Sequence, residues 1–413
     1  MDINKENQLK QQDKYNKKYP TSTFPYSVIE GLAGEFTKTY CDILEIPPEF
    51  MYISFLTCLG SLLARSLTIS TEIKPQPRLY TLLLGQSADE RKSTALIETI
   101  RFFEHTLQKR NVNNITQEQT QFQLHTCLGA GSAEGLAKKL KDENLLLCYD
   151  EFKAFISKAT IRNSTLLQCV NTLFESNTYE NQTSTSEIKI KNGRLSLLAA
   201  STMQTYESAW HSSFTAIGFN NRLFIVPGAA QREYSLPPKI ANEEKYYLSN
   251  ELYKILDFVG EFRELDITKG ARELFHEWYM NRPHSIHSKR LDGYALRFME
   301  LLAVNKMKEI IDESIVNNAI ELMDWQFEVR QLYDPIDADN IAAKMEEKIR
   351  RALSHKSKKT GATIPLTDRG LKQMTNANRT GLYFYGLALK NLQESAEISF
   401  NGRAKTWSLT EKE

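Results

Sequence analysis

The segment Arg78–Thr94 constrains the fold of this chain more than any other part of it. An apolar stretch, Leu79–Leu84, leads through Gly85 and a polar loop into Lys92-Ser93-Thr94, after which apolar residues recur at helical spacing. A strand that passes through a loop into a helix start directs several backbone N–H groups at one point, where they stabilise an anion. The segment therefore predicts a phosphate-binding loop at one edge of an α/β sheet.

This loop departs from the usual pattern, Gly-x-x-x-x-Gly-Lys-Ser/Thr, because Gly85 lies one residue too far upstream and Arg91 replaces the second glycine. Lys92 would place a positive charge on the β- and γ-phosphates of ATP, and Ser93 would offer an oxygen to Mg²⁺. An ordinary helix N-terminal cap is the alternative. The residues expected around the nucleotide are Gly85, Gln86, Ser87, Ala88, Asp89, Glu90, Arg91, Lys92, Ser93 and Thr94.

A second apolar run, Asn144–Tyr149, ends in two adjacent carboxylates, Asp150 and Glu151. Such a continuous apolar run is typical of a buried parallel strand. In P-loop ATPases the first acid of such a pair belongs to the Mg²⁺ shell and the second polarises the attacking water. We expect Asp150 and Glu151 to take these two roles, and the alternative is a strand that ends in solvated acids.

Two further strands add candidates. The run from Arg194 ends in Ser201 and Thr202, which with Gln204 could sense the γ-phosphate, or could only cap the next helix. Arg222 precedes a predicted strand, Leu223–Val226. An arginine there could reach the γ-phosphate of a neighbouring subunit and stabilise the transition state, or it could form a buried structural ion pair.

Composition limits the class of protein. A chain of 413 residues with 41% hydrophobic residues can bury a full core and form two or three domains, and its net charge of +1 restricts nucleic-acid contacts to local surfaces. Five scattered cysteines without metal-ligand spacing indicate reduced thiols. The polar first residues lack the apolar core of a secretory signal, and no apolar run approaches the roughly 20 residues of a membrane span. We expect a cytoplasmic protein without a membrane partner.

Downstream of Pro237-Pro238, four segments have helical periodicity and predict a helical lid: 246–261, 270–279, 291–304 and 313–332. Arg297 lies in the third of these segments. It could reach the nucleotide from the lid as a second sensor, or be an ordinary surface arginine.

The C-terminal part, after the acidic, proline-containing segment 333–339, predicts a winged helix-turn-helix. A helix over 341–355 is followed by a basic loop, helices over 367–374 and 382–393, and a hairpin over 398–409 with an Asn-Gly turn. In such modules the third helix enters the major groove and the wing contacts phosphates. The apolar segment 382–389 leaves protein docking as the alternative. The expected nucleic-acid contacts are Lys358, Lys359, Arg379, Lys390, Arg403 and Lys405.

Taken together, these motifs resemble a known family. Residues from about Phe24 to Arg297 are similar to the helicase-like P-loop domain that phages, plasmids and integrated elements carry beside or fused to primase-polymerases. The resemblance rests on the helical segment before the loop, the Arg-Lys-Ser-Thr loop, the Asp150-Glu151 strand and Gly218–Ile225. It implies an ASCE-type ATPase of the AAA+ or RecA-like branch that uses ATP and Mg²⁺. It also implies a homo-oligomer such as a hexameric ring, in which Arg222 acts across the subunit interface.

The sequence thus predicts an α/β P-loop NTPase with a mainly parallel sheet flanked by helices. Its expected parts are a disordered tail over 1–20, a helical segment over 21–72, the ATPase core over 73–236, the lid over 237–333 and the winged helix over 340–413. The expected function is that of an ATP-dependent motor or remodeller acting on DNA or RNA, a helicase or helicase loader, with a primase-polymerase as possible partner. The alternatives are a non-hydrolysing initiator or scaffold, and a regulatory AAA+-type ATPase of transposition or phage defence.

Overall fold

The computed structural model describes residues 22–85, 91–113, 122–182, 187–210, 212–229, 236–334, 341–354 and 363–410. The tail expected over 1–20, the loop residues Gln86 to Glu90, and Lys358 and Lys359 lie outside the described residues. The chain divides into two compact units. The larger is Phe24–Arg330, and the smaller contains the described residues from Gln331 onward with Ser22 and Thr23.

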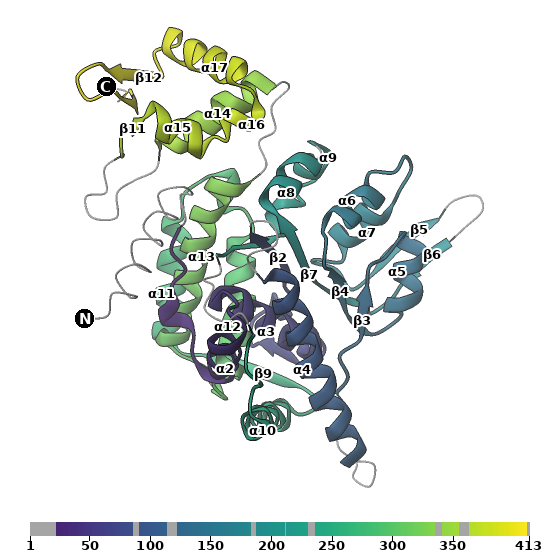
Figure 1. Cartoon of the computed structure of the whole chain (residues 1–413). Coiled ribbons are helices and arrows are strands. Elements are labelled where there is room, and N and C mark those ends of the chain that lie inside the picture. Colours follow the sequence, from purple (N-terminus) through teal and green to yellow (C-terminus); the bar gives the residue numbers. More distant parts are fainter. Residues whose placement is uncertain are drawn as a thin grey trace, which may run out of the picture. The chain divides into compact units, whose positions relative to one another are not determined.

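A five-stranded parallel sheet forms the centre of the larger unit, with the strand order β3-β4-β7-β2-β8 (Figure 1). Every residue of β2 and most of β7 are buried, because these strands lie inside the sheet and helices cover both faces. The predicted α/β class with a parallel sheet is confirmed. The strands of this sheet are β2 (Tyr80–Gly85), β3 (Thr126–Leu128), β4 (Asn144–Tyr149), β7 (Arg194–Thr202) and β8 (Phe224–Pro227).

The register of the sheet brings three strand ends together. Gly85 at the end of β2 pairs with Thr202 at the end of β7, and Tyr149 at the end of β4 pairs with Ala199. Parallel strands all end at the same edge of their sheet. The loop after Gly85, the acids after Tyr149 and the polar end of β7 therefore share the carboxyl edge.

Neighbouring residues of β2 face opposite sides of the sheet, as strand geometry requires. On one side Thr81 contacts Thr57 of α3 (Pro48–Leu63), with 2.7 Å between the hydroxyl oxygens, and α4 (Lys92–Asn113) packs beside α3. On the other side the Tyr80 hydroxyl donates to the carbonyl of Val170 in α7 (Leu166–Thr172). Tyr294 of α12 (Leu291–Asn305) covers the same side and donates to Tyr80 O.

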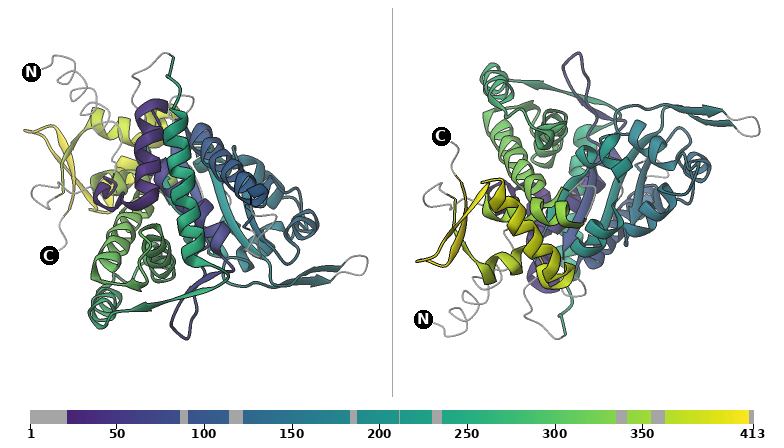
Figure 2. Two further views of the ribbon diagram at one scale, coloured as in Figure 1. Left: turned by 90° about the horizontal axis from the view of Figure 1, so that it is seen from below. Right: turned by 90° about the horizontal axis from the view of Figure 1, so that it is seen from above.

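Two smaller sets of strands were not predicted from the sequence. β1 (Leu67–Ile69), β9 (Arg263–Ile267) and β10 (Ile310–Ile311) form a parallel sheet that joins the segment before the loop to the segment after Pro238. β5 (Tyr179–Gln182) and β6 (Glu187–Ile190) pair antiparallel and project from the unit as an arm (Figures 1 and 2). The region expected to be a helical lid is therefore not only helical.

Helices surround these sheets. In the larger unit α2 lies beside α10, as the views in Figure 2 also show. Among the helices of the described residues, none combines the length and apolar character needed to cross a lipid bilayer. The remaining helices of this unit are α2 (Gly31–Leu44), α5 (Ala133–Leu140), α6 (Lys153–Ala159), α8 (Met203–Ala209), α9 (Ser212–Ala216), α10 (Asn242–Val259), α11 (Lys269–Asn281) and α13 (Glu313–Tyr333), with short 3₁₀ turns η1 (Tyr26–Val28), η2 (Asn220–Arg222) and η3 (Ile286–Ser288).

In the smaller unit, helices pack on a three-stranded antiparallel sheet of order β11-β13-β12 around a core that includes Trp407. The helices are α14 (Ile341–Leu353), α15 (Asp368–Met374), α16 (Ala377–Thr380) and α17 (Leu382–Glu394), and the strands are β11 (Leu366–Thr367), β12 (Ile398–Asn401) and β13 (Thr406–Leu409).

The expected Asn-Gly pair lies at the turn of the hairpin in the smaller unit. Four residues, 402–405, connect β12 to β13, so Asn401 ends the first strand and Gly402 begins the turn. The Asn401 side chain accepts hydrogen bonds from Arg403 N at 3.0 Å and Ala404 N at 3.1 Å, and Lys405 has a φ of 53°. The asparagine thus closes the turn through its side chain.

Candidate active site at the carboxyl edge

Lys92, Ser93 and Thr94 form the first turn of α4, as predicted. The first intrahelical hydrogen bond runs from Ala95 N to Arg91 O at 2.9 Å. The backbone N–H groups of Lys92, Ser93 and Thr94 consequently have no acceptor within the helix. Together with the helix dipole they favour an anion at this point.

Arg91, the residue that departs from the usual loop pattern, takes a conformation typical of glycine. Its φ is 49°, in the left-handed region that glycine adopts most easily. Its guanidinium Nη2 lies 3.1 Å from Oε2 of Glu45, the residue that follows α2, and the Glu45 side chain is only 4% exposed. At Arg91 the backbone thus takes a conformation that suits glycine, while the side chain is bound by Glu45.

Asp150 and Glu151 follow β4 directly, and both keep a substantial part of their surface exposed. The next residue anchors this turn, because Phe152 N donates to Ala200 O of β7 at 2.7 Å. Partial burial and the neighbouring charge of Asp150 raise the pKa of Glu151, while the charges of Lys92 and Lys153 oppose the rise. Lys92 is therefore close enough to Glu151 for the two charges to interact.

Ser201 and Thr202 lie at the end of β7, between β2 and β4. The Thr202 hydroxyl caps α8, because it accepts a hydrogen bond from Thr205 N at 3.1 Å. Ser201 is buried, and its hydroxyl donates to Thr202 O at 3.2 Å. The capping alternative thus holds for Thr202, and the role of either hydroxyl toward a γ-phosphate stays a prediction.

The donors at this edge fit a magnesium ion. The Ser93 hydroxyl and the Asp150 carboxylate are hard oxygen ligands of the kind that Mg²⁺ prefers. Among the described residues, no group of three or more His, Cys, Asp or Glu side chains could hold a metal. A cation bound here would therefore depend on phosphate and water for its other ligands, as is usual for Mg²⁺ with nucleotides.

Arg297 does not lie at this edge. It is buried on α12, and its guanidinium donates to Arg78 O and Phe174 O, both at 2.8 Å. Arg78 precedes β2, so that Arg297 lies at the amino edge, about 23 Å along the strand from Gly85 at about 3.3 Å per residue. The prediction of a second sensor at Arg297 is not supported, because its donors are used by backbone carbonyls at the wrong edge.

Arg222 also lies near the amino edge, because β8 begins at Phe224, which pairs with Thr81 of β2. Its Nη1 donates to Gly218 O at 2.9 Å and to Ile217 O at 3.2 Å. Burial and the nearby charge of Arg290 lower the pKa of Arg222 to about 10. It does not reach the carboxyl edge of its own chain, and its role in trans stays a prediction.

In the smaller unit, Arg379, Lys390, Arg403 and Lys405 are all exposed. Lys390 lies 3.7 Å from Glu394 on the same helix, and Arg403 and Lys405 belong to the turn between β12 and β13. Their side chains are accessible to a phosphate backbone.

Sequence reasoning missed two residues of this site. Glu45 pairs with Arg91 from a distant helix, and no local pattern indicates such a partner. Lys153 was missed as a charge that acts on Glu151, although its place at the start of a helix directly after the acids could have indicated it.

No protein-family model matches the chain, and a comparison with curated proteins found no match.

Proposed function

We propose that this chain is an ATP-dependent nucleic-acid motor or remodeller, helicase-like or a helicase loader, of the ASCE class of P-loop ATPases. The observation that carries the proposal is the common edge of β2, β7 and β4. There the helix start with Lys92 and the acids after Tyr149 are near enough for Lys92 to act on the pKa of Glu151. A positive helix start facing a carboxylate pair is what phosphoryl transfer to water requires.

In this proposal each residue at the edge has one role. The N–H groups of Lys92, Ser93 and Thr94 hold the phosphates, and the Lys92 ammonium binds the oxygens that gain charge. Glu151 accepts a proton from the attacking water, and its raised pKa brings its basicity nearer to working pH. Ser93 and Asp150 would hold Mg²⁺, which when bound neutralises phosphate charge.

The proposal assigns Arg222 to the site of a neighbouring subunit in a homo-oligomer. Its hydrogen bonds to Gly218 O and Ile217 O are to backbone carbonyls, so no carboxylate is left unpaired when they break. An arginine supplied in trans stabilises the charge of the transition state.

The smaller unit is proposed to be a winged helix that binds DNA or RNA through its backbone. The order of its elements supports this, because α15 and α17 are joined by a short turn with α16 and followed by the β12–β13 hairpin. Arg403 and Lys405 at the hairpin turn would contact phosphates. The apolar residues of α17, such as Tyr383 with 76% of its surface exposed, argue against reading of base edges and for limited sequence specificity.

The pairing of Arg91 with Glu45 supports the motor over the non-hydrolysing scaffold. An arginine side chain at the phosphate position would block the nucleotide, and here Glu45 binds that side chain. A primase-polymerase partner, and a role in replication of a mobile element, are part of the same proposal.

ATP turnover of the full chain with and without single-stranded DNA tests the proposal. We expect DNA to stimulate turnover and Lys92→Ala to weaken binding of a fluorescent ATP analogue about 10- to 100-fold, since a charged hydrogen bond contributes about 1.5–3 kcal/mol. Lys153→Ala is the matched control for the binding measurement alone, because it removes a nearby lysine that the proposal does not assign to the phosphates. An assembled oligomer that binds ATP tightly but turns none over, with or without DNA, would favour the scaffold.

A further inference from the structure

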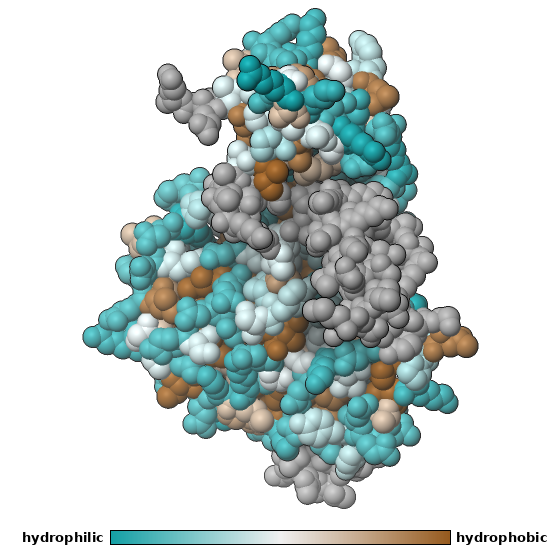
Figure 3. All heavy atoms as spheres, turned by 60° about the vertical axis from the view of Figure 1, so that its left-hand side comes forward, coloured by the Kyte–Doolittle hydropathy of each residue, from teal (hydrophilic) through white to brown (hydrophobic). Residues whose placement is uncertain are grey.

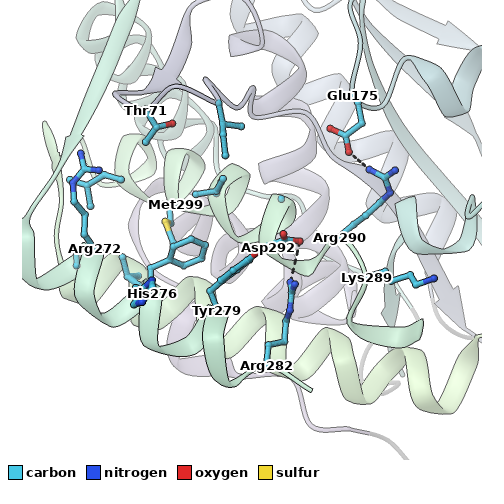
Figure 4. A pocket seen from close by; sticks show the side chains of 17 residues that line it. Thr71, Glu175, Arg272, His276, Tyr279, Arg282, Lys289, Arg290, Asp292 and Met299 are labelled. Atoms are coloured by element: carbon cyan, nitrogen blue, oxygen red, sulfur yellow. Dashed lines mark hydrogen bonds and ion pairs between the residues drawn. The ribbon is translucent and has the colours of Figure 1, made fainter. Parts of the chain in front are cut away.

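A cavity of about 1020 Å³ lies in the larger unit (Figure 4). It is lined by α11, by α12 and by the turn after β1, where Ile73 is 76% exposed. None of the residues assigned to ATP belongs to its lining. The volume is at the upper end of the range for ligand pockets, so the cavity can accept more than a small metabolite.

The charged side chains of this cavity are mostly cationic. Four cations, Arg272, Arg282, Lys289 and Arg290, and two carboxylates, Glu175 and Asp292, line it, an excess of two positive charges. The carboxylates are paired, since Arg282 lies 3.1 Å from Asp292 and Arg290 binds Glu175. Within the described residues neither Arg272 nor Lys289 has a carboxylate within 4.0 Å, and Figure 4 places these two cations at opposite ends of the cavity.

Aromatic side chains occupy the space between the two cations. Phe275 and Tyr279 lie on one face of α11, because residues at i and i+4 of a helix are neighbours, and His276 also lines the cavity. The Phe275 and Tyr279 rings are 6.4 Å apart between centroids, and Tyr279 remains 46% exposed. Met299 of α12 forms a buried apolar wall opposite them. The face of the molecule that is turned forward in Figure 3 is hydrophilic with separate hydrophobic patches.

We propose that this cavity binds a segment of single-stranded nucleic acid. Arg272 and Lys289 contact phosphates at the two ends, and a base stacks on the Phe275–Tyr279 face between them. Aromatic rings beside a cationic path are the features by which proteins hold single strands without reading their sequence. A duplex keeps its bases stacked inside, and a mononucleotide engages one end only. The inference extends the proposed nucleic-acid function and does not depend on ATP hydrolysis.

Fluorescence anisotropy with a labelled oligothymidylate and the full chain, without nucleotide, tests this proposal. The background carries Arg403→Glu and Lys405→Glu, so that the smaller unit contributes little. Adding Arg272→Glu with Lys289→Glu should weaken binding at least tenfold more than the control pair Lys245→Glu with Lys269→Glu, which makes the same charge change on exposed lysines outside the cavity. The dependence of the binding constant on salt should also fall, by roughly 0.7 for each phosphate that the protein no longer neutralises.

The aromatic part of the site has its own test. Tyr279→Ala should weaken binding at least fivefold, whereas Tyr279→Phe retains it, because stacking needs the ring and not the hydroxyl. An oligonucleotide with photoreactive 5-iodouracil should cross-link within residues 272–290. Thermal melting confirms that each variant is folded.

Three outcomes would overturn the inference: equal affinity of the charge-reversed and control pairs, cross-links only outside residues 272–290, or equal competition by a duplex or a mononucleotide. Lys92→Ala separates the two proposals, because it should bind the oligothymidylate normally. A variant that loses ATP binding but binds the oligonucleotide normally would leave this inference intact. A variant that loses oligonucleotide binding but binds ATP normally would leave the ATP site intact.

Discussion

The two edges of the central sheet use charged residues in opposite ways. At the carboxyl edge, Asp150 and Glu151 are exposed, and the first N–H groups of α4 lack helical acceptors. At the amino edge, the Arg78 and Arg297 guanidiniums are buried and donate to backbone carbonyls. A ligand site needs polar groups that a ligand can reach, and among the described residues Asp150 and Glu151 are accessible whereas the Arg297 donors are buried against carbonyls.

The amino edge illustrates what structural arginines do. Arg78 donates to Leu173 O at 2.9 Å and Arg297 to Phe174 O at 2.8 Å, so both hold the turn after α7. The Arg297 guanidinium also lies 4.0 Å from the centroid of the Phe174 ring. Burial, with the nearby charge of Arg297, lowers the pKa of Arg78 to about 9. Arg78 and Arg297 thus connect, through hydrogen bonds, segments that are far apart in the sequence.

Substitutions of Arg222 and Arg297, which both lie near the amino edge, separate a catalytic arginine from a structural one, and they give the largest effect we expect. Arg222→Ala should leave ATP binding intact and lower turnover about 1000-fold, because an arginine finger contributes at least that factor. Arg297→Met should lower the free energy of unfolding by about 3 kcal/mol, because buried carbonyls lose their charged donor, without changing ATP affinity of the folded protein. Steady-state turnover, nucleotide titration and urea unfolding measure the three quantities.

A monomeric form that hydrolyses ATP at the full rate would show that Arg222 has no role in trans. Arg297→Lys keeps the charge and should lose less stability than Arg297→Met. If Arg297→Met instead abolished nucleotide binding in a protein that melts normally, the contrast between the two edges would be wrong.

The carboxylates of the carboxyl edge give the second prediction. Glu151→Gln should bind ATP as the unmodified chain does and turn it over at least about 100-fold more slowly, because general-base catalysis contributes about that factor or more. Single-turnover measurements separate binding from chemistry. Turnover by Glu151→Gln near the original rate would remove Glu151 from the reaction.

The same residue predicts a pH dependence. Glu151 accepts a proton only when ionised, so turnover should fall as the pH is lowered through its pKa. Because burial and Asp150 raise that pKa, the fall should occur at a higher pH than for an ordinary glutamate near 4.3. Lys153→Ala removes a charge that lowers the pKa and should move the fall to higher pH still, whereas an unchanged pH profile would show that Glu151 is not the titrating base.

Sequence patterns found β2, β4 and β7 because each is an apolar run followed by polar residues or a polar loop, as Asn144–Tyr149 is by Asp150 and Glu151. They missed β1, β9 and β10, which have two to five residues and pair over long sequence separations. The sequence also could not predict at which edge of the sheet Arg297 lies. Because α12 is buried around most of its circumference, its apolar pattern does not indicate which side of the helix faces which edge. Ligands, oligomeric state and the pairing of Arg91 with Glu45 all depend on tertiary or quaternary contacts that spacing does not encode.

The smallest effect we predict concerns Arg91, which replaces the second glycine of the usual loop pattern at the carboxyl edge. Its positive φ costs an ordinary side chain about 1 kcal/mol, and its partly exposed pair with Glu45 returns less than that. Arg91→Gly should therefore be about 1 kcal/mol more stable than Arg91→Ala, and both should bind ATP at least as tightly as the unmodified chain. Urea unfolding and nucleotide titration measure these differences. Weaker ATP binding by Arg91→Gly would mean that the arginine itself contacts the phosphates. The loop would then bind nucleotide in a different way from the usual motif, with Arg91 as a ligand of the phosphates and not as a replacement for glycine.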